Sequence, residues 1–178
     1  MRGWHQSRLV AVAIAASAFT LFASAASAAD EVGGVITRTY LIVEDTDLVG
    51  DVICDVGSSP CFSFGASGVE LRLNGFTITG KADAAVGCAG PGNLPGEFGV
   101  TTNARDNVVV RGPGVVQRFG NHGVFVTGSS NTRVEGLTVS TNCGSGILVA
   151  ANSFGTLVAG NVAVRNGSAR AGFSCGGI

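Results

Sequence analysis

Charged residues are scarce in this sequence of 178 residues: Asp, Glu, Lys and Arg together make up 13%, about half the share of an average soluble domain. The formal net charge of −1 lacks the basic excess by which nucleic-acid-binding domains attract phosphates, so no nucleic-acid partner is expected. Only four residues are proline, and the 28 glycines follow no three-residue period, which excludes a collagen-like chain. Hydrophobic residues reach 46%, too many for an intrinsically disordered chain. The length fits one domain.

The sequence also lacks the ligand spacings typical of metal sites. Its five cysteines contain no Cys-x-x-Cys pair and its two histidines follow no metal-binding spacing, so no metal is expected. Cys54 and Cys61 flank a Gly-Ser-Ser-Pro turn and are predicted to form a local disulfide. Cys88 and Cys143 can pair only if the fold brings them together, and because five is an odd number one thiol is left over. The pairing of Cys88, Cys143 and Cys175 therefore stays open.

The first 28 residues have the three parts of a secretory signal peptide. Arg2 and Arg8 give a basic start, residues 9–22 an apolar stretch, and Ala26-Ser27-Ala28 a small-residue cleavage site. The apolar stretch is shorter than the ~20 residues that cross a bilayer, which favours cleavage over a membrane anchor. We expect a mature domain of residues 29–178, secreted, periplasmic or on the cell surface, with no membrane contact after cleavage.

An internal repeat with a period of roughly 24 residues dominates the mature sequence. Gly112, Gly136 and Gly160 are equally spaced at this period, and each follows a valine by two positions. Gly50 and Gly75 extend this series backward. The column of residues two positions before these glycines is predicted to be a core ladder, with the members Leu73, Val110, Val134 and Val158. A second series runs in parallel: Gly99-Val100, Gly123-Val124, Gly146-Ile147 and Gly172-Phe173.

Within each repeat the apolar residues alternate with period two, as in β-strands, and no stretch of useful length after the signal peptide favours a helix. Glycines at the bends, and Asn107 and Asn131 at equivalent turn positions, tolerate the left-handed backbone conformation. Short strands at a fixed period predict an all-β solenoid of about five coils. Each coil buries its apolar column against the coils above and below.

The segment Gly68-Val-Glu-Leu-Arg-Leu-Asn-Gly-Phe-Thr-Ile-Thr-Gly80 resembles the opening coil of secreted right-handed parallel β-helix proteins with pectate-lyase-like or NosD-like repeats. Residues 109–115, 121–124 and 134–137 are similar to that family's repeats. The resemblance covers residues 33–178 and implies a single-stranded right-handed parallel β-helix. It departs from the family in a Gly/Ala/Pro-rich insertion at about 81–97. The family includes polysaccharide lyases, hydrolases, epimerases and proteins with no known activity, so the resemblance does not settle function.

The C-terminal end also departs from the family pattern, because the sequence stops where another coil is expected to begin. We expect the chain to be a fragment of a longer protein, or to associate with itself through this open end. In that case Cys175 is the thiol left without a partner.

The catalytic groups of sugar-cleaving enzymes on this scaffold are not evident. Elimination needs a base and usually Ca²⁺ held by carboxylates, and hydrolysis needs two carboxyl groups at a defined separation. With Val100, Val124 and Ile147 directed inward, their outward neighbours are Thr101, Phe125 and Leu148, and none is a carboxylate. Catalysis by this strand face is therefore disfavoured.

His122 and Asp106 are the two weak catalytic candidates. His122-Gly123 matches two of the three residues of the Gly-His-Gly motif of polygalacturonases, but their paired aspartates and Arg-x-Lys motif have no counterpart here. A solvated turn role is favoured for both residues. Glu135 shares its coil position with Arg111 one repeat earlier, which predicts an outward salt bridge.

The sequence therefore predicts an exported β-helix protein that serves as a structural scaffold or a polysaccharide-binding surface and uses no cofactor. The alternative is a carbohydrate-active enzyme, pectate-lyase-like or polygalacturonase-like, or a fragment of one. Ca²⁺ would be needed only if the lyase alternative held. An extracellular polysaccharide is the expected partner, and carboxylates on outward strand positions would discriminate between the two functions.

Overall fold

The computed structural model describes residues 28–82, 88, 96–150, 152–167 and 177–178. In these residues the chain is all-β, with thirteen strands and no helix. The described part of the chain therefore contains no helix able to span a membrane. The predicted signal peptide lies outside the described residues except for Ala28, as do most of the predicted insertion and Cys175.

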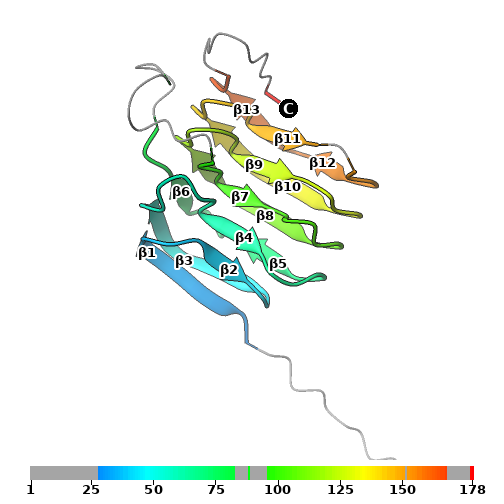
Figure 1. The fold of residues 1–178 in the computed structure, drawn as a ribbon. Helices are drawn as coiled ribbons and strands as arrows, with labels where there is room; N and C mark the ends of the chain where they lie inside the picture. Colours follow the sequence, from blue (N-terminus) through cyan, green and yellow to red (C-terminus); the bar gives the residue numbers. More distant parts are fainter. Residues whose placement is uncertain (1–27, 83–87, 89–95, 151, 168–176) are drawn as a thin grey trace, which may run out of the picture.

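The strands form two sheets in which every observed pairing is parallel (Figure 1). Sheet A contains β1 (Asp30–Ile36), β3 (Thr46–Cys54), β5 (Glu70–Arg72), β6 (Thr77–Thr79), β8 (Val109–Gln117), β10 (Arg133–Ser140), β12 (Leu157–Ala159) and β13 (Val162–Val164). Sheet B contains β2 (Tyr40–Ile42), β4 (Phe62–Phe64), β7 (Val100–Thr101), β9 (Val124–Val126) and β11 (Ile147–Val149). The chain thus alternates between the two sheets.

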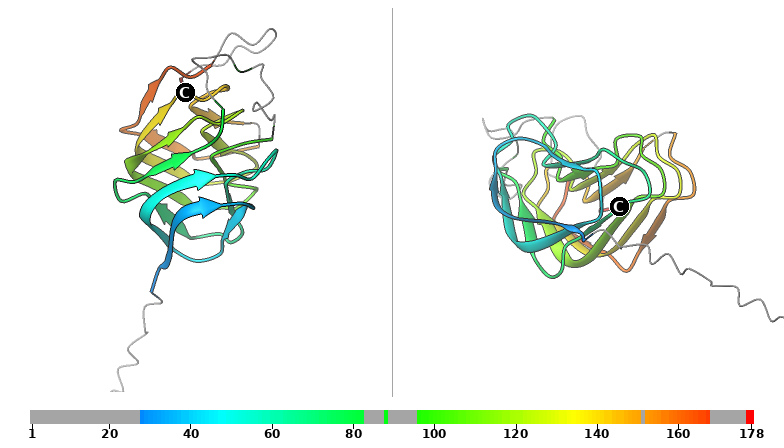
Figure 2. Two further views of the ribbon diagram at one scale, coloured as in Figure 1. Left: turned by 90° about the vertical axis from the view of Figure 1, so that its left-hand side faces the viewer. Right: turned by 90° about the horizontal axis from the view of Figure 1, so that it is seen from below.

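Each pass of the chain through the sheets forms one layer, and successive layers stack along one axis (Figure 2). The layers are β1 and β2, then β3 and β4, then β5, β6 and β7, then β8 and β9, then β10 and β11, and last β12 and β13. Val110 pairs with Val134, and Val134 pairs with Val158, so the predicted spacing of the repeat is confirmed. The parallel, stacked arrangement is consistent with a β-helix-like solenoid.

The hydrophobic core lies between the two sheets and runs through all layers. Val110 and Val134 are fully buried on sheet A, as are Val100, Val124 and Ile147 on sheet B. The predicted inward positions are therefore confirmed on both sheets. Val158, in the last described layer, is only partly buried and packs against the core from one side.

One member of the predicted ladder was misplaced. Leu71, and not Leu73, pairs with Val110. The error comes from the bend in sheet A, which varies in length from layer to layer. Leu71 is seven residues before Ile78 and Val134 is five residues before Val139, although Ile78 and Val139 both pair with Val116. Leu73 is fully buried, but it lies in this longer bend, and Leu71 occupies the position that pairs with Val110.

The glycines of the repeat series differ in the structural constraint that they meet. Gly75, Gly136 and Gly160 have φ angles of 91°, 67° and 65°, in the left-handed region that the sequence predicted for bends. Gly112 instead lies against the next layer: a Cβ atom there would be 2.0 Å from the Gly136 carbonyl oxygen. Gly50 has neither constraint, because no heavy atom lies within 4 Å of its Cβ position.

Asn107 and Asn131 occupy the same turn in adjacent layers, as predicted. Both have φ of 56°, and Asn131 Nδ2 donates a hydrogen bond to Asn107 Oδ1 at 3.2 Å. The left-handed conformation explains why asparagine recurs at this turn one repeat later.

Two disulfides connect the described cysteines. Cys54 and Cys61 are bonded, as the sequence predicted. Cys88 and Cys143 are bonded as well, across 55 residues of sequence, because the fold brings Cys88 to the turn between β10 and β11. Both bonds are compatible with an exported protein, since disulfides persist in oxidising compartments.

The outward face of sheet A carries paired charges. The predicted salt bridge between Arg111 and Glu135 is confirmed, with Nη1 and Oε2 2.9 Å apart. Arg72 contacts Asp45 and Asp47 from the preceding layer at 2.6 and 3.2 Å. These pairs are partly exposed, so they define the register of neighbouring strands more than they stabilise the fold.

Candidate binding surface on sheet B

His122 lies immediately before β9, and its hydrogen bonding defines its chemical state. The backbone N–H of Ser145, in the next layer, donates to His122 Nδ1 at 2.9 Å. Because Nδ1 accepts, the proton of the neutral ring is on Nε2. Burial lowers the pKa of His122, and protonation would also break the bond from Ser145. The ring is therefore a neutral donor through Nε2.

Three aromatic rings lie together on the outer side of sheet B. The Phe98 and Phe125 rings are stacked with centroids 4.9 Å apart. His122 lies 5.8 Å from Phe98 and 5.6 Å from Phe125. All three side chains are half-buried. We call Phe98, His122 and Phe125 the aromatic shelf. Such rings present large apolar faces at little cost in side-chain entropy.

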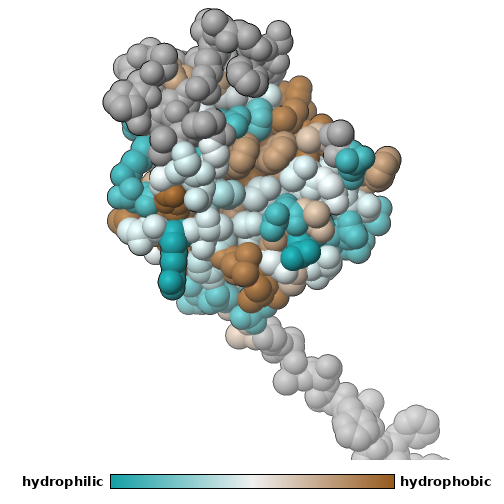
Figure 3. Space-filling model, in the orientation of Figure 1, coloured by the Kyte–Doolittle hydropathy of each residue, from teal (hydrophilic) through white to brown (hydrophobic). Residues whose placement is uncertain are grey.

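A row of outward side chains leads away from the shelf across sheet B. Phe125 pairs with Thr101 on one side and Leu148 on the other, and Thr101 pairs with Ser63. Ser63 pairs in turn with Leu41 of β2. Ser63 and Thr101 occupy outward positions of this row yet are only 6% exposed. Figure 3 shows this face, with hydrophobic surface over β2 and over β9 and β11, and paler surface between them.

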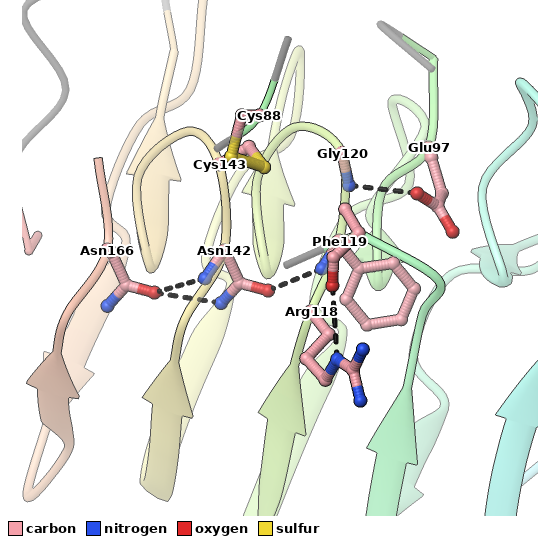
Figure 4. Close-up of a disulfide and its surroundings, with 9 residues drawn as sticks. Cys88, Glu97, Arg118, Phe119, Gly120, Asn142, Cys143 and Asn166 are labelled. Carbon is pink, nitrogen blue, oxygen red and sulfur yellow. Dashed lines mark hydrogen bonds between the residues drawn. A yellow bond between two sulfur atoms is a disulfide. The ribbon is translucent and has the colours of Figure 1, made fainter. Parts of the chain in front are cut away.

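Glu97 supports the shelf from beneath. The residue is 2% exposed, and its carboxylate accepts backbone N–H bonds from Gly120 at 2.9 Å and Lys81 at 3.1 Å, the first of which is visible in Figure 4. The Glu97 carbonyl accepts the N–H of Asn121 at 3.1 Å. Glu97 therefore holds the segments that contain Phe98 and His122 in fixed positions.

A buried asparagine lies behind the shelf, beside the Cys88–Cys143 disulfide (Figure 4). Asn142 Oδ1 accepts the N–H of Phe119 at 3.1 Å, and its Nδ2 donates to Asn166 Oδ1 at 2.9 Å. Asn166 Nδ2 donates to the Val139 carbonyl. Asn166 belongs to an Asn-Gly-Ser sequon, and in the fold it is half-buried with its amide nitrogen bonded to the Val139 carbonyl.

We expect Glu97→Gln to change stability in a pH-dependent way. Burial raises the pKa of Glu97 in the folded protein, against the opposing effect of its backbone hydrogen bonds. The folded state therefore binds this proton more tightly than the unfolded chain. That contribution to stability is present below about pH 4.5, the ordinary Glu value, and is lost as pH rises through the folded pKa.

Unfolding titrations at a series of pH values measure this effect. The stability of the wild type relative to Glu97→Gln should fall as pH rises above about 4.5 and then level off. Glu31→Gln, at an exposed position of β1, is the control. A pH-independent difference for Glu97→Gln would contradict a raised pKa.

Asp106, the second weak candidate, and His122 lie at opposite ends of the sheet B strands. His122 precedes the short strands of sheet B, and Asp106 follows them. Asp106 Oδ1 accepts the N–H of Ser130 in the next layer at 2.6 Å, and its carbonyl accepts the N–H of Gly68. This is the turn role that the sequence favoured, and the two candidates form no acid–base pair.

The N-terminal acids are used in a similar way. Asp45 Oδ1 accepts the N–H of Glu70, and Asp51 Oδ1 accepts the N–H of Thr77. Both bonds connect the second layer to the third. No cluster of three or more His, Cys, Asp or Glu side chains able to hold a metal ion occurs in the described part of the chain.

The sequence identified only part of this surface. The sequence predicts His122 as a candidate, and the repeat predicts that Phe125 points outward. Phe98 and Glu97 are not predictable in this way, because they lie at the end of the insertion. Residues of the insertion have no equivalent in the other repeats, so the repeat does not indicate which way their side chains point. The one available signal was an acidic residue beside an aromatic residue, directly before Gly99-Val100.

No family model, curated protein or solved structure matches this chain.

Proposed function

We propose that this protein is an exported right-handed parallel β-helix whose sheet B binds an extracellular polysaccharide without cleaving it. The aromatic shelf stacks against the apolar face of a sugar ring, and His122 Nε2 donates to a sugar oxygen. The row from Phe125 toward Leu41 receives the rest of the chain, since neighbouring layers provide contacts every ~4.8 Å.

The observation that carries this proposal is the hydrogen bond from Ser145 to His122. A general base needs a free lone pair, but His122 Nδ1 is occupied and Nε2 holds the proton. Both oxygens of the nearby carboxylate, Glu97, accept backbone N–H groups, and the group is buried. This environment suits binding better than proton transfer.

A binding assay with purified residues 29–178 tests the proposal. On a panel of soluble plant and microbial polysaccharides, Phe125→Ala should weaken binding at least tenfold, a loss of about 1.4 kcal/mol in binding free energy. The matched control is Phe154→Ala, because Phe154 is 68% exposed and lies after β11, away from the shelf. Equal losses for both variants, or no binding by the wild type, would contradict the proposal.

The same samples test for catalysis. Incubation with pectate, alginate and polygalacturonate, with and without Ca²⁺, should release neither unsaturated products nor new reducing ends. An activity that disappears in His122→Ala would show that the histidine is catalytic and that the binding proposal is wrong.

A further inference from the structure

The first layer closes one end of the hydrophobic core. β1 lies at this end of the stack (Figure 1), and among the described residues it pairs only with β3, so its other edge has no strand partner. A free strand edge above an open core is a template for pairing with another chain. Yet Val32 on β1 is 7% exposed and Ile42 on β2 is fully buried. The core is therefore sealed at this end, although no described layer lies beneath it.

The path of β1 is shortened at the bend of sheet A. Val32 and Gly34 pair with Leu48 and Val52 respectively, so β1 advances two residues across the bend where β3 advances four. Gly34 has a φ of 82°, in the left-handed region that glycine adopts readily. The shorter path narrows the first layer and helps to close the core.

An aspartate occupies the inward position at the start of β1. Asp30 lies on the same side of the strand as the buried Val32. It pairs with Thr46, which is 1% exposed, and Thr46 pairs with Leu71. The inward column, which is leucine or valine in the later layers, thus becomes threonine and then aspartate. A second copy stacked on β1 would bury this carboxylate against its own end layer, which is unfavourable for a charge that gains no cation.

A hydrogen bond between the two sheets holds Asp30 in place. The Tyr40 hydroxyl, on sheet B, donates to Asp30 Oδ2, and Asp30 Oδ1 accepts the Glu31 N–H at 2.9 Å. Burial, together with Asp30, raises the pKa of Tyr40 to about 12, so the hydroxyl stays protonated at neutral pH. The Tyr40 ring packs against Phe62 in the second layer, with ring centroids 5.4 Å apart. A polar pair therefore spans the core below its last aromatic contact.

From this geometry we infer that the first layer is a cap that prevents β1 from pairing with a second copy of this protein. The inference does not depend on polysaccharide binding. Val35 and Leu41 are exposed at the same end, but they occupy outward positions. Val35 pairs with the exposed Ile53, and Leu41 pairs with Ser63 of the sheet B row. Because addition of opposite ends to each other produces an open filament, a cap at one end restricts any self-association to closed assemblies.

Removal of the cap should allow further association. Asp30→Val combined with Tyr40→Phe removes the inward charge and its hydrogen-bond donor but keeps a ring against Phe62. The full chain is expressed with its predicted signal peptide, and the exported protein is studied by sedimentation velocity over a wide range of concentrations. At high concentration the average mass of the double variant should be at least about twice that of the wild type, the smallest change that one added copy gives.

Glu31→Val is the matched control. It removes the same charge and adds the same side chain on the same strand, but Glu31 pairs with Asp47 on the outer face, so wild-type assembly is expected. Circular dichroism establishes that each variant is folded. Asp30→Asn, which keeps an acceptor for Tyr40, should also associate, because an amide is less costly to bury than a charge.

The outcomes decide the inference in each case. A folded double variant of unchanged mass overturns it, as does an equal increase in mass for Glu31→Val. If the double variant does not fold, the same criterion applies to Asp30→Asn. A wild-type protein whose mass rises without limit as its concentration increases also overturns the inference, because its first layer would then not act as a cap.

Discussion

Val134→Asp is expected to destabilise the protein by at least about 4 kcal/mol, enough to unfold many domains of this size. Val134 is fully buried in β10 and pairs with Val110 below and Val158 above. An aspartate there places a carboxylate between two apolar layers with no cation within the column, and burial of an unpaired charge costs several kcal/mol. Thermal unfolding followed by far-UV circular dichroism measures the loss, which corresponds to roughly 10 °C or more.

Arg133→Ala is the matched control, because Arg133 is the neighbouring residue on the same strand and points outward. Its ion pair with Glu135 is half-exposed, so the substitution should cost under about 0.5 kcal/mol. Similar losses for the two variants would mean that the register of β10 is shifted by one residue, since such a shift exchanges the inner and outer faces.

Gly112→Ala is expected to cost about 2–3 kcal/mol, although it adds a single methyl group, because overpacking of a close contact is costly. The added Cβ would lie 2.0 Å from the Gly136 oxygen, 2.5 Å from the Gly136 carbonyl carbon and 3.1 Å from the Leu137 nitrogen. All three are backbone atoms of the next layer, so no side chain can rotate away. Relief requires β8 and β10 to separate.

Gly50→Ala distinguishes this steric effect from a general effect of glycine replacement. Gly50 belongs to the same repeat series, but its Cβ position is open and its φ is not in the left-handed region. The substitution should leave the free energy of unfolding unchanged or raise it by about 0.5 kcal/mol, because alanine restricts the unfolded chain. Chemical denaturation of both variants gives the comparison, and an equal loss for both would exclude the close contact at Gly112 as the cause.

The repeat made the later layers predictable from sequence. Between residues 99 and 163 the period is nearly constant, so an alternation of apolar and polar residues suffices to place Val100, Val124 and Val134 inward. The salt bridge between Arg111 and Glu135 followed from the same register. In this region each residue packs against the equivalent residue one repeat away. A single sequence is therefore sufficient to predict which side chains are buried.

Prediction failed where the spacing changes. The bend after Leu71 is longer than the bends after Val110 and Val134, and this moved Leu73 out of the predicted column. The insertion before β7 likewise separates Glu97 and Phe98 from any repeated position. Their importance comes from contacts with Gly120 and Phe125 in the fourth layer, and such contacts are evident only when the layers are stacked.

The disulfide between Cys88 and Cys143 has a consequence for how the molecule opens. In a stacked fold of this kind, fraying begins at an end layer and moves inward, because each layer is stabilised only by its neighbours. Cys88 belongs to the third layer and Cys143 to the fifth, so the covalent bond encloses the fourth. Fraying that starts at β12 and β13, the last described layer, therefore meets a barrier at the fifth layer, and the third, fourth and fifth layers open as one cooperative unit. The aromatic shelf lies within this unit, so its geometry is insulated from local unfolding at the end of the stack.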